Sequence, residues 1–208
     1  MVTYTYTSLP SLEEIWACLD SVSDPEIPIL SVVDLGIVRN VRWIEEDKET
    51  DFPTKQTSPR ENPTSVIDGR LRRPGSQRTQ RSDLTLLVTV TPTYSGCPAM
   101  AVIKNDIQQA LQQRGISRVR IETQLSPAWT TDSMTERGRK RLREYGIAPP
   151  ELHHHKLGLA SEARSTGIPC PRCGSSDTRL VSRFGSTPCK AFYICNSCLE
   201  PFDYFKCH

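Results

Sequence analysis

The chain has 208 residues, of which 26 are basic and 24 acidic, giving a formal net charge of +2. A hydrophobic fraction of 37% supports a small folded core, and a protein of this size is too small to be a large barrel enzyme. A net charge of only +2 gives no electrostatic reason to expect a nucleic-acid-binding protein. The N-terminus lacks the pattern of a signal peptide, and no stretch has the length and apolarity of a membrane span. We therefore expect a cytoplasmic protein that binds neither nucleic acid nor membrane.

The first predicted element is a helix that begins after Ser11. Ser11 can cap the first turn, and Glu14, three residues later, completes a capping box. Apolar residues then recur at helical spacing as far as Val22. The proline-containing stretch 24–28 ends this helix, and a strand is predicted over 37–44.

Residues 45–83 differ from their surroundings in composition. They are poor in apolar residues, contain several prolines, and change from acidic to arginine-rich along their length. We expect a flexible insertion between two paired strands, although long structureless loops are uncommon in compact domains.

Beyond the insertion, a buried strand is predicted over 84–90 and a helix over 98–113. Alternation of apolar and charged residues predicts a further strand over 118–125, and a short basic helix should span 135–145. The order helix-strand-strand-helix-strand indicates an α+β protein whose first domain occupies residues 1–145.

The end of the chain forms a separate predicted module over 168–208, joined by a linker over 146–167 that contains three consecutive histidines. We expect the histidines to be solvated. The module is rich in aromatic residues, which should form a small core with one face left for a partner subunit. These aromatic residues are Phe192, Tyr193, Phe202, Tyr204 and Phe205.

Two Cys-x-x-Cys pairs within this module predict a metal site. Cys170 and Cys173 form the first pair, and Cys195 and Cys198 form the second, with 21 residues between the pairs. Two such turns facing each other across a hairpin can hold one zinc ion in a tetrahedron of sulfurs. A module of this size cannot bury enough surface to fold unaided, so the metal would supply folding energy. Structural zinc is favoured, with an iron–sulfur cluster or a redox dithiol as alternatives.

Two further thiols in the module, Cys189 and Cys207, exceed the needs of one tetrahedral site. They can pack as small apolar groups beside the ribbon. Alternatively, they can form an auxiliary exchangeable metal or redox site.

In the first domain, Cys97 lies between a buried strand and a predicted helix. Pro98 suits the first helical position, which would put Cys97 near the cap. Backbone donors and the helix dipole at that position would favour the thiolate and lower its pKa. The alternative is that Cys97 is an ordinary cap or core residue.

Three acidic residues are candidate neighbours of this thiol. Asp24 and Glu26 lie in the proline-stiffened loop, and Asp34 lies in the next turn. Carboxylates held near a thiolate can share a metal with it. Their alternative role is to cap helices and form turns.

The basic residues of the predicted helix 135–145 suggest a further possibility. A zinc-ribbon protein could use them to bind nucleic acid, or they could simply be solvated. They are Arg137, Arg139, Lys140, Arg141 and Arg143.

Several motifs resemble known families. Three motifs in the first domain are similar to the small domain of cytosolic iron–sulfur assembly factors: 24–28 (Asp-Pro-Glu-Ile-Pro), 34–36 (Asp-Leu-Gly) and 93–98 (Thr-Tyr-Ser-Gly-Cys-Pro). Four others resemble the D subunit of bacterial phenylacetyl-CoA epoxidase, a multicomponent oxygenase of phenylacetate degradation: 126–132, 142–147, 184–191 and 200–207. Within this resemblance, the long insertion 45–83 and Ser133, where an aromatic residue is expected, are departures.

The resemblance implies an accessory or maturation component of a ring-epoxidising monooxygenase, without catalysis of its own. The oxygenase chemistry would belong to a separate di-iron subunit, supplied with electrons by a flavin and iron–sulfur reductase. Cys97 would hold iron or a cluster transiently, Asp24 and Glu26 would shape that site, and the ribbon would dock the partner. The alternative is a purely structural subunit that organises the oxygenase and the reductase.

Overall fold

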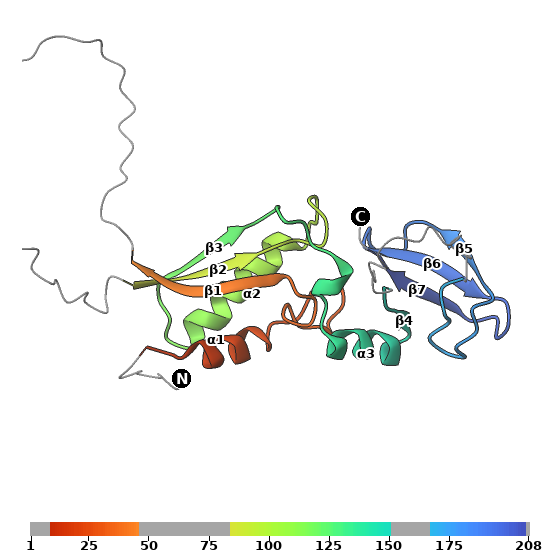
Figure 1. Ribbon diagram of the computed structural model, residues 1–208, viewed down its shortest axis with the longest axis horizontal. Coiled ribbons are helices and arrows are strands. Elements are labelled where there is room, and N and C mark those ends of the chain that lie inside the picture. The colour runs from red at the N-terminus through yellow and green to blue at the C-terminus, as the bar shows by residue number, and fades with distance from the viewer. Residues whose placement is uncertain (1–8, 46–83, 151–166, 207–208) are drawn as a thin grey trace, which may run out of the picture.

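A computed structural model describes residues 9–45, 84–150 and 167–206. Its first unit contains α1 (Leu12–Leu19), β1 (Val38–Glu45), β2 (Leu84–Val90), α2 (Met100–Gln113) and β3 (Val119–Thr123). The short helix η2 (Thr131–Ser133), α3 (Glu136–Tyr145) and β4 (Ile147–Ala148) follow. The last unit contains β5 (Thr178–Ser182), β6 (Lys190–Cys195) and β7 (Pro201–Phe205) (Figure 1). Within these described ranges, no helix has the length and apolarity needed to cross a membrane.

The capping box predicted for α1 is present. The Glu14 backbone N–H donates to the Ser11 hydroxyl at 3.2 Å, and the Ser11 N–H donates to the Glu14 carboxylate at 2.8 Å. Two orphan backbone donors are thereby satisfied at the start of the helix. The helix ends at Leu19, before Val22, which is buried in the loop that follows.

The first sheet has the order β1-β2-β3, with β1 antiparallel and β3 parallel to β2. The predicted order of helices and strands is therefore confirmed. Glu45 pairs with Leu84, so the segment 46–83, which lies outside the described residues, joins two paired strands. This end of the sheet lies at the end of the molecule away from the second sheet (Figure 1).

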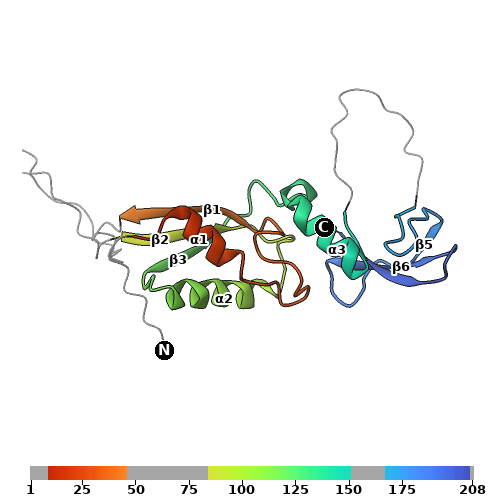
Figure 2. The same cartoon turned by 90° about the horizontal axis from the view of Figure 1, so that it is seen from below.

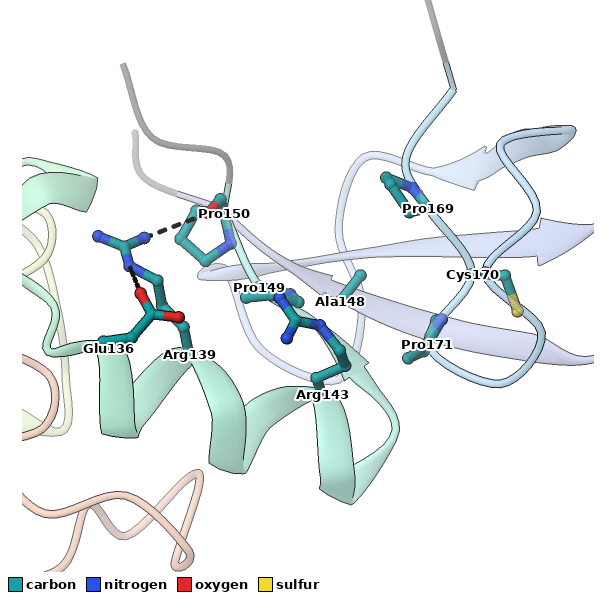
Figure 3. A pocket seen from close by; sticks show the side chains of 10 residues that line it. Glu136, Arg139, Arg143, Ala148, Pro149, Pro150, Pro169, Cys170 and Pro171 are labelled. Atoms are coloured by element: carbon teal, nitrogen blue, oxygen red, sulfur yellow. Dashed lines mark hydrogen bonds and ion pairs between the residues drawn. The ribbon is translucent and has the colours of Figure 1, made fainter. Parts of the chain in front are cut away.

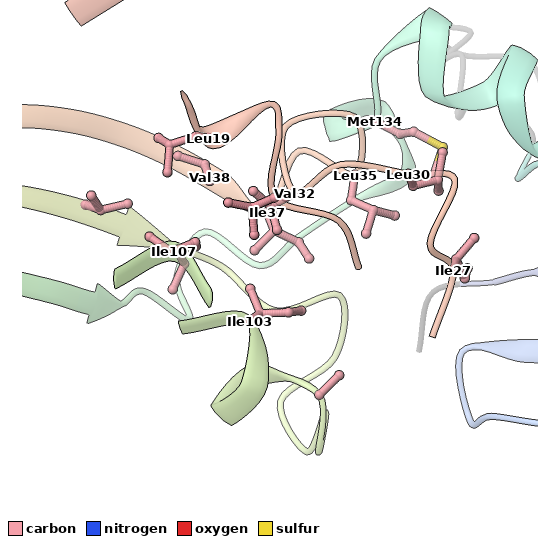
Figure 4. Close-up of a cluster of buried hydrophobic side chains, with 14 of the residues drawn as sticks. Leu19, Ile27, Leu30, Val32, Leu35, Ile37, Val38, Ile103, Ile107 and Met134 are labelled. Atoms are coloured by element: carbon pink, nitrogen blue, oxygen red, sulfur yellow. The ribbon is translucent and has the colours of Figure 1, made fainter. Parts of the chain in front are cut away.

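Helices α1 and α2 contact each other and pack against this sheet in one core (Figure 1 and Figure 2). Their apolar residues meet one face of β2, on which Leu86, Val88 and Val90 have no exposed surface. The loop between α1 and β1 adds several branched apolar side chains to the same core (Figure 4). Burial of this contiguous cluster is the main stabilising contribution to the first unit.

The second sheet has the order β4-β7-β6-β5 and includes a strand from the range predicted as linker. Ile147 and Ala148 form β4, which runs parallel to β7 and pairs with Asp203 and Tyr204. The chain thus joins the second sheet directly after α3. Residues 151–166, with the three histidines, lie outside the described residues.

The second unit contributes Phe205 and Cys189 to the hydrophobic core of the first unit. Phe205, on β7, packs edge to face on Trp129 with ring centroids 6.1 Å apart, and the indole N–H of Trp129 donates to the Leu35 carbonyl at 2.8 Å. The ribbon's own core contains Phe202, with Tyr193 and Tyr204 partly buried against it. The predicted aromatic core is therefore divided, because Phe205 belongs to the core of the first unit.

Helix α3 is joined to the first unit by a buried carboxylate. Arg137 Nε and Arg141 Nη1 donate to the two Asp34 oxygens at 2.6 and 2.7 Å, and the Asp34 side chain has no exposed surface. Burial raises the pKa of Asp34, but hydrogen bonds from Arg137, Thr135 and Ser31 lower it by more, so the net pKa lies below its usual value. Asp34 thus does more than form a turn.

The other basic residues of α3 also have structural roles. Arg139 is buried and donates to the carbonyls of Thr131, Met134 and Pro150. Lys140 pairs with Glu144 on the exposed face. The helix therefore presents less free positive charge than its sequence suggests.

Candidate metal centre and domain junction

Four cysteines of the second unit gather their sulfurs at one point. Cys170 Sγ lies 3.7 Å from Cys198 Sγ, and Cys173 Sγ lies 3.6 Å from Cys195 Sγ. All four sulfurs lie within 4.8 Å of one another. A tetrahedral zinc ion with Zn–S bonds of about 2.3 Å needs sulfurs about 3.8 Å apart, so these residues fit such an ion.

Local backbone geometry builds each Cys-x-x-Cys turn. Gly174 has φ = 76°, as the left-handed turn after the first pair requires, and its N–H donates to the Cys170 carbonyl. At the matching position of the second turn, Leu199 has φ = 64° and donates to the Cys195 carbonyl. A leucine rarely adopts this conformation, so no local pattern predicts it.

The thiols are unequal in acidity. Backbone N–H groups of Cys198 and Ser197 help lower the pKa of Cys195 to about 6. The Glu200 N–H lowers the pKa of Cys198, but burial and the three neighbouring thiols raise it to about 12. Four thiolates this close repel one another unless a cation is present, so metal binding must release protons.

A cavity of about 530 Å³ lies between α3 and the first cysteine turn (Figure 3). Arg139, Arg143, Pro149 and Pro171 line it, and so does the metal-ligand candidate Cys170. Arg139 is held in the cavity wall by Pro150 and Glu136. The predicted metal centre therefore lies next to α3, across this cavity.

The Cys97 loop differs from its prediction. Helix α2 begins at Met100, its cap residue is Ala99, and Cys97 lies before that cap. Burial raises the pKa of the Cys97 thiol, and Glu26 and Asp24 raise it further, against hydrogen bonds from the Ala99 and Met100 backbones. The expectation of a lowered pKa is therefore wrong, because burial outweighs the helix start.

Asp24 organises its own loop. One oxygen, Oδ1, accepts from the N–H groups of Glu26 and Ile27, both at 2.8 Å. Burial raises the pKa of Asp24 despite these two donors. Its turn-forming role, the alternative considered from the sequence, is confirmed.

Glu26 extends from this loop to the second unit. The Cys189 thiol donates to Glu26 Oε2 at 3.4 Å, and Lys190 Nζ lies 3.4 Å from the Glu26 carbonyl. Cys189 is 5% exposed and lies 3.0 Å from the Thr187 hydroxyl. Burial and Glu26 raise the pKa of Cys189 to about 11.

Glu26 contacts Cys189 at the domain junction, and the charges of Glu26 and Asp24 act on the Cys97 thiol. Tyr94 lies in the same neighbourhood, because burial and the nearby Cys97, Glu26 and Cys189 raise its pKa. In the described part of the chain, only the four ribbon cysteines already have metal-site spacing. Sequence reasoning missed the Glu26–Cys189 contact, since the two residues are 163 positions apart in the chain. Cys207 lies outside the described residues.

Comparisons with known proteins agree with these features. Residues 156–206 match the family described as the PaaD zinc beta ribbon domain. A protein of Escherichia coli (strain K12), described as the D subunit of a "Putative 1,2-phenylacetyl-CoA epoxidase", is 43% identical over 198 residues. That match covers 95% of this chain and 94% of the relative.

Solved structures show weaker likenesses. A DUF59 domain from Bacillus anthracis has a TM-score of 0.40 at 20% identity, covering 62% of this chain and 89% of that one. A Mycobacterium tuberculosis protein, described as associated with Fe-S complex assembly and repair, has a TM-score of 0.31 at 25% identity, covering 69% and 94%. Likenesses at these scores carry no inference about function. On the strength of the full-length relative, the chain belongs to the family of phenylacetyl-CoA epoxidase D subunits, and it ends in a zinc ribbon of the PaaD type.

Proposed function

We propose that this protein is a cytoplasmic accessory subunit that assists assembly or maintenance of the iron or iron–sulfur centres of a phenylacetyl-CoA epoxidase. Its partners are the di-iron oxygenase and the reductase of that complex. The observation that carries the proposal is the position of Cys97, a half-buried thiol that packs against the core shared with the ribbon and whose pKa is raised by the Glu26 and Asp24 charges.

The ribbon metal has a structural role in this proposal. Cys170, Cys173, Cys195 and Cys198 supply four thiolates and leave no open coordination position for exchange. Zinc is the ion that this donor set suits best. It fixes the ribbon, which then presents a constant surface to the partner subunit.

In this proposal, the residues at the domain junction bind the metal transiently. Because burial raises the pKa of Cys97, the thiol is protonated at neutral pH and binds a metal only by releasing its proton. This proton competition weakens binding, which suits a site that must pass its metal on. Glu26 is only partly buried, so its carboxylate can turn toward the incoming ion, while Asp24 keeps the loop in shape.

The test is the substitution Cys97→Ser in cells that also express the oxygenase and the reductase. We expect the iron content of the purified partners to fall severalfold, while the ribbon keeps its zinc. The matched control is Cys18→Ser, because Cys18 is a buried thiol that donates to the Ala110 carbonyl, away from the junction. Unchanged iron content and epoxidase activity in Cys97→Ser would refute the proposal.

A purely structural subunit is the second candidate. The shared core at Trp129 and Phe205 favours it, because that contact fixes the two units against each other, as a bridge between two partners requires. This candidate predicts that Cys97→Ser is silent, whereas loss of the ribbon metal prevents co-purification of the partners.

A further inference from the structure

The junction contains a second thiol whose position is set by the ribbon. Cys189 immediately precedes β6, and the last residue of β6 is the metal-ligand candidate Cys195. A tight turn fixes its place, since the Gly185 N–H donates to the Lys190 carbonyl at 2.8 Å and the Lys190 N–H donates to the Thr187 carbonyl at 3.1 Å. Metal binding that orders the ribbon therefore also positions Cys189.

Cys189 faces the first unit rather than the interior of the ribbon. It belongs to the same core cluster as Leu35 and Trp129, with Cys97 partly buried against that cluster. Its thiol donates to Glu26 Oε2 at 3.4 Å. The charge of the same Glu26 also acts on the Cys97 thiol, so one carboxylate interacts with thiols from both units.

The chemistry of these groups suits a thiophilic divalent cation. Two thiolates and one carboxylate supply sulfur and oxygen donors, a mixture that Fe(II) and Zn(II) accept. Without a cation the thiols keep their protons, because burial and the Glu26 and Asp24 charges oppose ionisation. Side-chain rotation of Cys97 and Glu26, both partly buried, would complete the coordination.

We propose that Cys189 joins Cys97 and Glu26 in a two-thiol site for a divalent cation of the Fe(II) type, a site formed only when the metal-bound ribbon is docked on the first unit. This inference rests on the proposed function, because it identifies the second thiol ligand of the transient site. Each bound thiolate forms a metal–sulfur bond, and its proton passes to solvent without any change of oxidation state.

The experiment uses the full chain with one equivalent of Zn(II) in the ribbon, kept anaerobic and reduced. Co(II) is then titrated as a spectroscopic probe, because thiolate–Co(II) charge-transfer absorption reports the number of bound sulfurs. The ribbon keeps its zinc, since a tetrahedral site of four thiolates binds Zn(II) more tightly than Co(II). We expect a second, weaker metal to bind with a charge-transfer band.

Cys97→Ser and Cys189→Ser should each halve this band and weaken Co(II) binding at least tenfold, and the double variant should remove the band. Cys18→Ser is the matched control and should leave it unchanged. Cys189→Ala, which retains packing better than a buried serine, should behave as Cys189→Ser does. Retention of one ribbon zinc and of the thermal unfolding midpoint shows that each variant is folded.

The outcomes separate the two proposals. Suppose that both Cys189 variants bind Co(II) with the wild-type charge-transfer band and affinity, whereas Cys97→Ser loses the band. The two-thiol site is then wrong, and metal binding at Cys97 stands. If the zinc-loaded wild-type chain shows no thiolate–Co(II) band, both the two-thiol site and metal binding at Cys97 are overturned.

Discussion

The indole of Trp129 meets the ring of Phe205 edge to face, with centroids 6.1 Å apart and planes inclined by 76°. Phe205 lies on β7 of the second sheet, whereas Trp129 is hydrogen-bonded to Leu35 of the first unit. The contact therefore links the ribbon to the core of the first unit. It explains how ordering of one unit can affect the other.

Phe205→Ala should weaken this link. Removing a fully buried phenylalanine costs about 3–5 kcal/mol, through lost burial and the cavity left behind. We expect the free energy of unfolding in urea to fall by about that amount and the fluorescence of Trp129 to change. Phe184→Ala, at a ring that is 61% exposed, is the control and should cost less than about 1 kcal/mol. If Phe205→Ala lowered the free energy of unfolding no more than Phe184→Ala does, burial of Phe205 would contribute nothing to stability.

Removal of the ribbon metal should unfold β5, β6 and β7, because this small unit depends on the metal for its stability. A chelator or Cys195→Ser should abolish the strand signal of this unit in hydrogen exchange while leaving β1, β2 and β3 protected. Metal analysis should give one tightly bound zinc per chain. Binding displaces thiol protons, so the apparent zinc affinity should fall as pH decreases below neutrality. A ribbon that stays protected in strong chelator would contradict this prediction.

Asp34→Asn should destabilise the contact between α3 and the first unit. The substitution keeps the size of the side chain but removes the counter-charge of Arg141 and leaves Arg137 paired with Asp20 alone. We expect a loss of about 2–3 kcal/mol, below the usual cost of breaking a buried pair because both arginines remain partly exposed.

The ion pairs that Asp34 forms with Arg137 and Arg141 also make the stability of the protein depend on pH. Folding lowers the pKa of Asp34, so its contribution to stability is present above the unfolded pKa of about 4 and disappears as pH falls through the lower folded value. Urea unfolding of wild type and Asp34→Asn should therefore converge at low pH. If the difference in unfolding free energy between the two proteins stayed constant at all pH values, this role of the Asp34 charge would be refuted.

Glu26→Gln should make Cys97 more reactive. The Glu26 charge raises the pKa of this thiol, so neutralising it lowers the pKa and increases the thiolate fraction at pH 8. Alkylation by iodoacetamide, followed at Cys97 by mass spectrometry, should be severalfold faster. Glu122→Gln, at an exposed residue paired with Arg120, is the control and should not change the rate.

Gly36→Ala should be more damaging than Gly146→Ala. Both glycines have positive φ, which costs a residue with a side chain about 1–2 kcal/mol. A Cβ at Gly36 would also lie 1.9 Å from the Ser133 carbonyl oxygen, whereas one at Gly146 meets nothing within 4 Å. We expect the difference in free energy of unfolding to exceed about 1 kcal/mol. Equal costs would mean that the η2 segment moves aside freely.

Local patterns predicted most of the secondary structure. The capping box placed α1, the apolar run 84–90 placed β2, and the two Cys-x-x-Cys pairs identified all four clustered thiols. These signals work because caps, strand alternation and chelating turns depend on residues only a few positions apart. The start of α2 was misplaced, since Pro98 suits a first helical turn but Cys97 and Pro98 form a turn before the Ala99 cap.

Contacts between distant segments could not be derived from those patterns. Asp34 looks like a turn residue until α3 brings Arg137 and Arg141 to it, and Cys189 looks like a ribbon residue until the fold brings it to Glu26. The sign of the Cys97 pKa shift depended in the same way on burial, which no local motif reports. Short-range geometry depends on neighbouring residues, whereas desolvation and charge pairing depend on which surfaces the folded chain places together.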